Sequence, residues 1–87
     1  MRLPRDLSGH ELIRLLRRYG YEITRQVGSH IRLQSSLRGH PHHVTVPDHR
    51  NLRLGTLSAI LSDVSIYLNI ERSELERELF GRDYSAN

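Results

Sequence analysis

The apolar positions between residues 8 and 20 repeat with the 3.6-residue period of an α-helix. Ser8 and Glu11 have the spacing of a capping box, which begins a helix, and Gly20 supplies the left-handed residue that ends one. One face of this stretch carries the apolar side chains Leu12, Ile13, Leu15, Leu16 and Tyr19. The opposite face carries Arg14, Arg17 and Arg18. The pattern therefore predicts an amphipathic helix between Ser8 and Gly20.

From Tyr21 the period changes to two, which is typical of β-strands. In the first predicted strand, Tyr21, Ile23 and Val27 are expected to share one face, and Glu22, Thr24 and Gln26 the other. Gly28 and Ser29 are typical of a tight turn. In the second predicted strand Ile31 and Leu33 face inward, and the opposite face carries His30, Arg32 and Gln34. The two strands are expected to form an antiparallel hairpin.

A third strand and two further helices complete the predicted order. Residues 35–41 form a polar connection, and a strand over about residues 42–46 is ended by Pro47, with Val44 and Val46 facing inward. A second helix begins at Gly55 and Thr56, and its apolar positions are Leu57, Ile60, Leu61, Val64 and Leu68. A last short helix over about residues 71–80 has three apolar residues, Leu75, Leu79 and Phe80.

The order α-β-β-β-α plus a C-terminal helix predicts an α+β fold, in which helices pack on one face of a three-stranded antiparallel sheet. We expect a single domain over residues 1–87, with its core at about 8–68. The chain has no cysteine, which excludes disulfides and thiolate chemistry. It has neither an apolar run that could span a bilayer nor an N-terminus like a secretory signal. We therefore expect a cytoplasmic protein with no membrane partner.

Charge is distributed unevenly along the chain. Residues 1–55 hold ten Arg against four acidic residues, whereas residues 56–87 hold three Arg against six, and all six histidines lie in the first part. A basic half of this kind indicates a polyanionic partner. All thirteen cationic residues are Arg, a side chain that contacts phosphate through two hydrogen bonds. An all-Arg set also follows from the coding bias of a GC-rich genome, which we favour as the explanation of that composition.

The Gly28-Ser29-His30 segment is the most interesting candidate for chemistry. A glycine allows a tight turn, and strand alternation then puts His30 beside Arg32 on the face away from the core. Imidazole transfers protons near neutral pH, and a guanidinium stabilises charge that gathers on phosphate oxygens. These are the components of phosphodiester cleavage. From spacing alone, a surface histidine that caps a turn is the favoured interpretation.

The other polar candidates also allow either a functional or a purely structural interpretation. Arg14, Arg17 and Arg18 either contact phosphates or form a solvated helix face. The histidines at positions 40, 42 and 43 suggest a metal site. However, adjacent strand residues point to opposite faces, and no carboxylate lies close in the sequence. We therefore expect no metal and no other cofactor. His49 lies in the loop before the second helix and, taken alone, is a polar loop residue.

Together these motifs resemble HicA, the toxin half of a type II toxin–antitoxin pair in the lineage also called YcfA-like. The resemblance covers residues 8 to about 70. It rests on the order and spacing of Ser8-Gly9, Tyr19-Gly20-Tyr21, Arg25, Gly28-Ser29-His30, Val44-Thr45-Val46-Pro47 with His49, and Gly55-Thr56-Leu57 with Ile60-Leu61. Each motif is weak alone, but their combination is specific.

The resemblance implies a double-stranded-RNA-binding-like fold, which agrees with the order predicted from periodicity. It also implies an mRNA interferase, a ribosome-independent ribonuclease whose catalytic histidine is His30 here. It further implies a HicB-type antitoxin that binds the toxin and covers this histidine. DNA would then be contacted only through the antitoxin.

We therefore interpret the chain as a metal-independent endoribonuclease that cleaves single-stranded mRNA with His30 as its catalytic residue. The positions expected to bind RNA are Arg14, Arg17, Arg18, Arg25, Gly28, Ser29, Arg32 and His49. The alternative is a non-catalytic RNA-binding module of the same fold that recognises A-form shape. Because the motif holds one histidine, the second proton transfer would pass through water.

Overall fold

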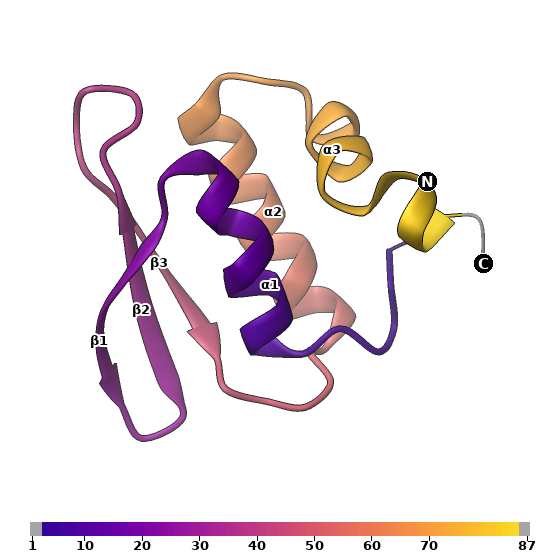
Figure 1. Cartoon of the computed structure of the whole chain (residues 1–87), viewed down its shortest axis with the longest axis horizontal. Helices are drawn as coiled ribbons and strands as arrows, with labels where there is room; N and C mark the ends of the chain where they lie inside the picture. Colours follow the sequence, from indigo (N-terminus) through magenta and orange to yellow (C-terminus); the bar gives the residue numbers. More distant parts are fainter. Residues whose placement is uncertain (1–2, 86–87) are drawn as a thin grey trace.

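The computed structural model describes residues 3–85, with side chains through residue 81. Its elements are α1 (Gly9–Leu16), a 3-10 turn (Arg17–Tyr19), β1 (Glu22–Val27), β2 (His30–Ser35), β3 (His42–Pro47), α2 (Leu54–Leu68) and α3 (Arg72–Ser85). The three strands form one antiparallel sheet in the order β1-β2-β3. Figure 1 shows α1 and α2 side by side on one face of the sheet, with α3 beyond them. The predicted α+β, double-stranded-RNA-binding-like layout is confirmed.

The core lies between the sheet and the helices. Strand alternation buries Ile31 and Leu33 of β2 completely and leaves their neighbours on the opposite, outer face of the sheet. All five apolar positions predicted for the second helix are buried, as are Leu75, Leu79 and Phe80 of α3. Because an antiparallel sheet can face water on one side, the outer face is free to carry polar side chains.

The start of α1 follows the predicted capping box. The Glu11 backbone N–H donates to the Ser8 hydroxyl oxygen at 3.0 Å, and the Ser8 N–H donates to the Glu11 carboxylate at 2.9 Å. The end differs from the prediction of one continuous helix, because the α-helix stops at Leu16 and a 3-10 turn follows. Gly20 then adopts a φ of 83°, as its position at the helix end requires.

Gly9 brings the start of α1 against the end of β3. Its N–H donates to the His49 carbonyl oxygen at 3.0 Å. A Cβ atom at this position would lie 2.1 Å from the Pro47 carbonyl oxygen, far inside contact distance. Only glycine therefore allows this approach, which fixes the loop after β3 beside the first helix.

The prediction that Tyr21, Ile23 and Val27 share one face is wrong for Val27 alone, although Ile23 is also more exposed than a core residue. Tyr21 is fully buried, but Ile23 is 42% exposed and Val27 is 59% exposed. One reason is that β1 is an edge strand. The other is a bulge between Ile23 and Arg25, which shifts the register so that Ile23 pairs with the inward-facing Leu33 but Val27 pairs with the outward-facing His30.

The third helix is longer than the predicted 71–80. It runs from Arg72 to Ser85, with a non-helical φ of 30° at Gly81 that joins two helical segments. Glycine tolerates this conformation, so the chain continues after the kink. Among the described residues, no helix is both long enough and apolar enough to cross a membrane.

Candidate functional site

The His30 site begins at the turn between β1 and β2. Gly28 adopts a φ of 58°, and no neighbouring atom would obstruct a Cβ there, so the requirement for glycine is conformational. His30 is the first residue of β2 and pairs with Val27 on one side and Pro47 on the other. Its side chain is exposed, as expected for a strand residue beside the buried Ile31. The turn therefore presents an accessible imidazole on the outer face of the sheet.

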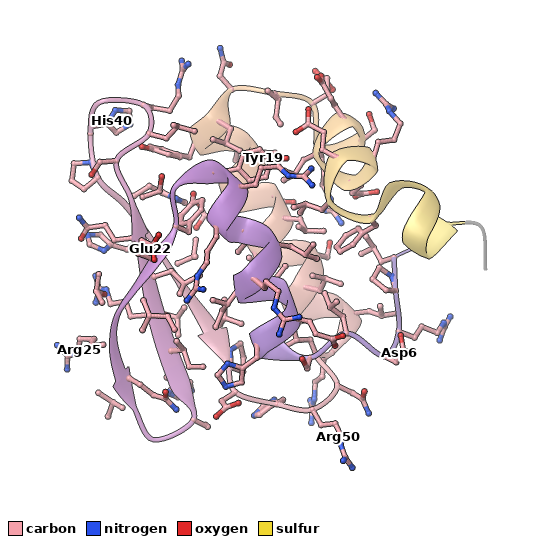
Figure 2. All side chains as sticks on the ribbon, in the orientation of Figure 1. Asp6, Tyr19, Glu22, Arg25, His40 and Arg50 are labelled. Carbon is pink, nitrogen blue, oxygen red and sulfur yellow. The ribbon has the colours of Figure 1, made fainter. Side chains whose placement is uncertain are left out.

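Two arginines share this face with His30. Arg32 lies two residues along β2 and is exposed, and its partner in the ladder is Arg25 of β1. Side chains of directly paired residues lie on the same face with Cβ atoms about 5 Å apart. Figure 2 shows Arg25 on the side of the sheet away from the helices. The site thus carries two paired arginines on the same sheet face as His30.

The bulge in β1 is what brings Arg25 to this site. Without it, strict alternation would place Arg25 on the same side as Tyr21 and Ile23, facing the helices. The Thr24 hydroxyl stabilises the bulge by donating to the Arg32 carbonyl oxygen at 3.3 Å. The sequence pattern alone does not reveal this feature, since periodicity predicts a regular strand.

The charge of the arginine pair is not compensated within the part of the chain that the structure describes. Like charges directly opposite in a sheet destabilise it, and no ion pair joins Arg25 or Arg32 to a carboxylate among residues 3–81. The nearest acid along β1, Glu22, lies 3.9 Å from Arg17 instead. An uncompensated pair of this kind is suited to an anion, and its planar donors match phosphate oxygens.

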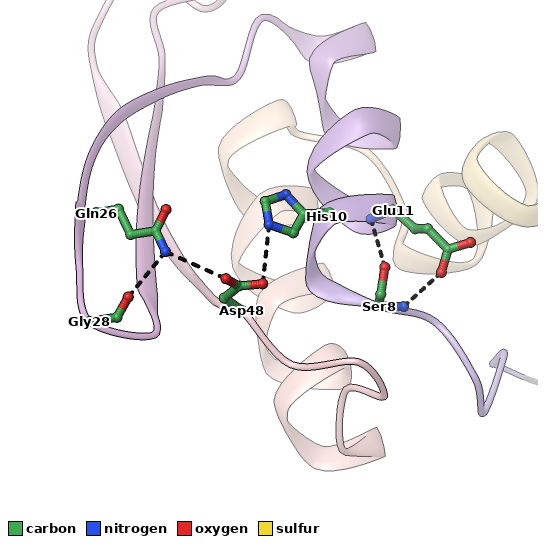
Figure 3. A network of polar contacts seen from close by, with 6 residues as sticks. All are labelled: Ser8, His10, Glu11, Gln26, Gly28 and Asp48. Carbon is green, nitrogen blue, oxygen red and sulfur yellow. Dashed lines mark hydrogen bonds and ion pairs between the residues drawn. The ribbon is translucent and has the colours of Figure 1, made fainter.

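A polar network behind the turn holds it in place (Figure 3). The Gln26 amide donates to the Gly28 carbonyl oxygen at 3.1 Å and to the Asp48 carboxylate at 3.5 Å. The other Asp48 oxygen lies 3.1 Å from His10 Nε2, on α1. The Asp48 backbone N–H also donates to the Ser29 carbonyl oxygen at 2.6 Å. The turn that carries His30 is therefore fixed to the first helix and to the end of β3.

The helix arginines lie elsewhere. Arg17 and Arg18 belong to the 3-10 turn in the helical layer; Arg17 faces Glu22, and an Arg18 guanidinium N–H donates to the Glu78 carbonyl oxygen of α3. Beside it the Tyr19 hydroxyl donates to the Glu78 carboxylate, and burial together with this bond raises the pKa of Tyr19 to about 12. Arg14 is exposed on α1. The predicted RNA-binding arginines therefore form two groups on different layers, and of them Arg25 and Arg32 share the sheet face with His30.

His49 is exposed in the loop after β3, and its backbone carbonyl oxygen accepts the Gly9 N–H described above. This loop starts at the strand end that pairs with His30. The position is compatible with a contact to a ligand at the His30 site, although the structure shows no interaction of the His49 side chain with His30.

The histidines of β3 point to opposite faces, as alternation predicts. His43 is exposed on the outer face, whereas His42 lies between helix and sheet. Its Nδ1 is 2.6 Å from the Tyr21 hydroxyl, and its Nε2 is 3.3 Å from the Asp63 carboxylate of α2. Its ring stacks on Tyr67, with centroids 4.7 Å apart. The sequence analysis found no carboxylate near these histidines because Asp63 lies about twenty residues away in the sequence, on α2, and meets His42 only in the folded protein.

The cluster around His42 is partly buried, with Asp63 at its exposed edge. Across the described side chains, no group of three or more His, Asp and Glu residues is placed to hold a metal ion. Burial, followed by the proximity of Tyr67 and Asp63, raises the pKa of Tyr21, so the hydroxyl stays protonated at neutral pH. Each nitrogen of His42 thus lies near a partner within the protein, Nδ1 near the Tyr21 hydroxyl and Nε2 near the Asp63 carboxylate.

Comparison with known proteins gives one match. A family model described as the HicA toxin of bacterial toxin–antitoxin systems matches residues 9–66, which is more than half of the chain. No curated protein and no solved structure matches the chain. The matched span runs from the first residue of α1 into α2, and it includes the Gly28-Ser29 turn, His30 and both arginines of the sheet face.

Proposed function

This chain belongs to the HicA toxin family of bacterial toxin–antitoxin systems, and on that basis we propose that it is an endoribonuclease whose catalytic residue is His30. The observation that carries the proposal is the outer sheet face, where an exposed imidazole shares the face with two paired arginines that no carboxylate of the described residues neutralises. The substrate would be single-stranded mRNA in the cytoplasm. A HicB-type antitoxin would neutralise the activity.

The proposed chemistry uses the ribose 2′-hydroxyl as nucleophile. His30 would remove its proton as a general base, or give a proton to the leaving 5′-oxygen as a general acid, while water completes the second transfer. Arg32 and Arg25 would stabilise the negative charge that develops on the phosphate oxygens. The Asp48 network would keep the turn, and with it the imidazole, in position. The products would carry a 2′,3′-cyclic phosphate and a 5′-hydroxyl group.

The test is cleavage of a long single-stranded RNA by the purified protein in EDTA. A general acid or base contributes about 10²–10⁴-fold to rate, so His30→Ala should lose cleavage by that factor. His43→Ala is the matched control, since His43 is exposed on the same face but pairs with Gln34 at the far end of the ladder. It should cleave at the parent rate. Equal cleavage by His30→Ala and the parent would refute the assignment.

Two other outcomes would redirect the proposal. If parent and His30→Ala bind RNA equally and neither cleaves it, the protein is a binding module that uses the arginine pair alone. If the parent cleaves only when EDTA is left out, and the products carry 5′-phosphate ends, the nucleophile is an activated water, usually bound to a metal ion, rather than the 2′-hydroxyl.

A further inference from the structure

The outer edge of β1 is open to pairing with another strand. β1 is the first strand of the sheet and pairs only with β2, so alternate backbone N–H and C=O groups along its other side have no strand partner. Both α1 and α2 pack against β3, whereas β1 is held chiefly by β2, and Figure 1 shows it on the side of the sheet far from α2. All six residues of β1 are exposed.

The side chains of this edge suit a protein partner. Natural edge strands are commonly protected by charged side chains, Pro or bulges. β1 (EITRQV) has no Lys or Pro, and its protection is limited to the charged Glu22 and Arg25 and to the bulge between Ile23 and Arg25. It also exposes two large apolar residues, Ile23 and Val27, which lie on opposite faces because of the bulge. Beyond the bulge, residues 25–27 pair regularly with β2, so this stretch retains the geometry that an added strand needs.

The charge of the edge defines the partner's chemistry. Arg25 lies between the two apolar residues, and Arg32 lies beside it on the next strand. A second copy of the chain paired through β1 about a two-fold axis would bring Arg25 close to its own counterpart, which like-charge repulsion disfavours. An extended segment with an acidic residue between apolar ones would instead complement both charge and hydropathy.

We propose that the antitoxin binds this toxin by adding such an acidic, apolar strand to the free edge of β1. The proposal rests on the proposed function in so far as the partner is the antitoxin. Val27 pairs directly with His30, and neighbouring strands are about 4.8 Å apart. The added strand would therefore lie two strands from His30, and its acidic side chain on the outer face would neutralise the arginines that bind phosphate. Neutralisation then acts on substrate binding.

The test uses the full-length His30→Ala protein, which can be prepared without cleaving RNA, together with the HicB-type antitoxin of its own operon. Amide hydrogen exchange is compared between the free and the bound protein. Strand addition should slow exchange at alternate amides of residues 22–27 by about tenfold or more. If these amides exchange equally in both states while amides of other elements become protected, the antitoxin binds elsewhere and the proposal is wrong.

Two variants provide a second measurement. Ile23→Asp places a negative charge on the edge and removes an apolar contact, so antitoxin affinity should fall by about tenfold or more. Ile66→Asp is the control, because Ile66 is 77% exposed but lies on α2. The opposite pattern, with loss of binding only in Ile66→Asp, would overturn the proposal. Ile23→Asp should cleave RNA like the parent protein, so a failure of cleavage in the parent would count against the proposed function and not against the strand pairing.

Discussion

Two histidines lie at opposite ends of the ladder between β2 and β3, and the fold gives them opposite environments. His30 pairs with Pro47 at one end, is exposed, and has no hydrogen bond to another side chain among residues 3–81. His42 pairs with Ser35 at the other end, stacks on Tyr67 and has a partner for each ring nitrogen. An imidazole can transfer protons to a substrate only if its nitrogens are accessible. The comparison therefore supports the proposed catalytic role of His30 and indicates a packing role for His42.

The largest effect expected on stability is that of His42→Ala. The substitution leaves the Tyr21 hydroxyl without its partner in a buried site and removes the ring that stacks on Tyr67. Loss of these contacts should lower the free energy of unfolding by about 2–4 kcal/mol. Denaturant unfolding measures this change, with the exposed His43→Ala as a control that should stay within about 0.5 kcal/mol of the parent. Equal stability of both variants would show that the His42 cluster contributes little.

The raised pKa values of Tyr19 and Tyr21 lead us to expect a loss of stability at alkaline pH. Folding raises the pKa of Tyr21, and it raises that of Tyr19 to about 12. Their contribution is complete below the unfolded pKa of about 10 and is lost as pH rises through the folded values. Unfolding experiments at about pH 9 and about pH 11 should show this decrease, and Tyr21→Phe should make it shallower. A pH-independent free energy of unfolding over this range would contradict the prediction.

The smallest expected effect concerns the arginine pair on the sheet face that carries His30. Arg25→Ala removes a like charge opposite Arg32, so the protein should gain about 0.2–1 kcal/mol in stability. If Arg25 contacts one phosphate, the slope of log affinity for RNA against log salt should fall by about 1. Paired melting and binding experiments measure both quantities. An Arg25→Ala protein that is less stable and has an unchanged salt slope would show that this side chain has a structural role.

Much of the scaffold follows from local signals in the sequence. Three predictions that depend only on residues within a few positions of one another are confirmed. They are the capping box at Ser8, the helix end at Gly20 and the apolar periodicity of α2. The outward direction of His30 and Arg32 also follows from alternation next to the buried Ile31. These features could be predicted because each depends on interactions between residues close in the sequence, and the fold does not override those interactions.

The features that the sequence did not predict depend on contacts between distant segments. The bulge in β1 reverses the faces of Arg25 and Val27, but residues 23–25 contain no glycine that would have marked a bulge in the sequence. The bond between His42 and Asp63 joins a strand to the following helix, and no pattern within either segment indicates it. Gly9 was recognised only as part of a motif, and its reason is a close approach to Pro47 that needs the folded structure.

The most direct test of the comparison measures RNA cleavage in EDTA and thermal melting on the same preparations of His30→Ala and His42→Ala. We expect His30→Ala to lose cleavage by about 10²–10⁴-fold while melting like the parent. His42→Ala should melt at a lower temperature and, measured below that temperature, should cleave within a few-fold of the parent rate. If His42→Ala abolishes cleavage while it remains folded, or if His30→Ala retains it, the catalytic role belongs to a part of the molecule other than the outer sheet face that carries His30.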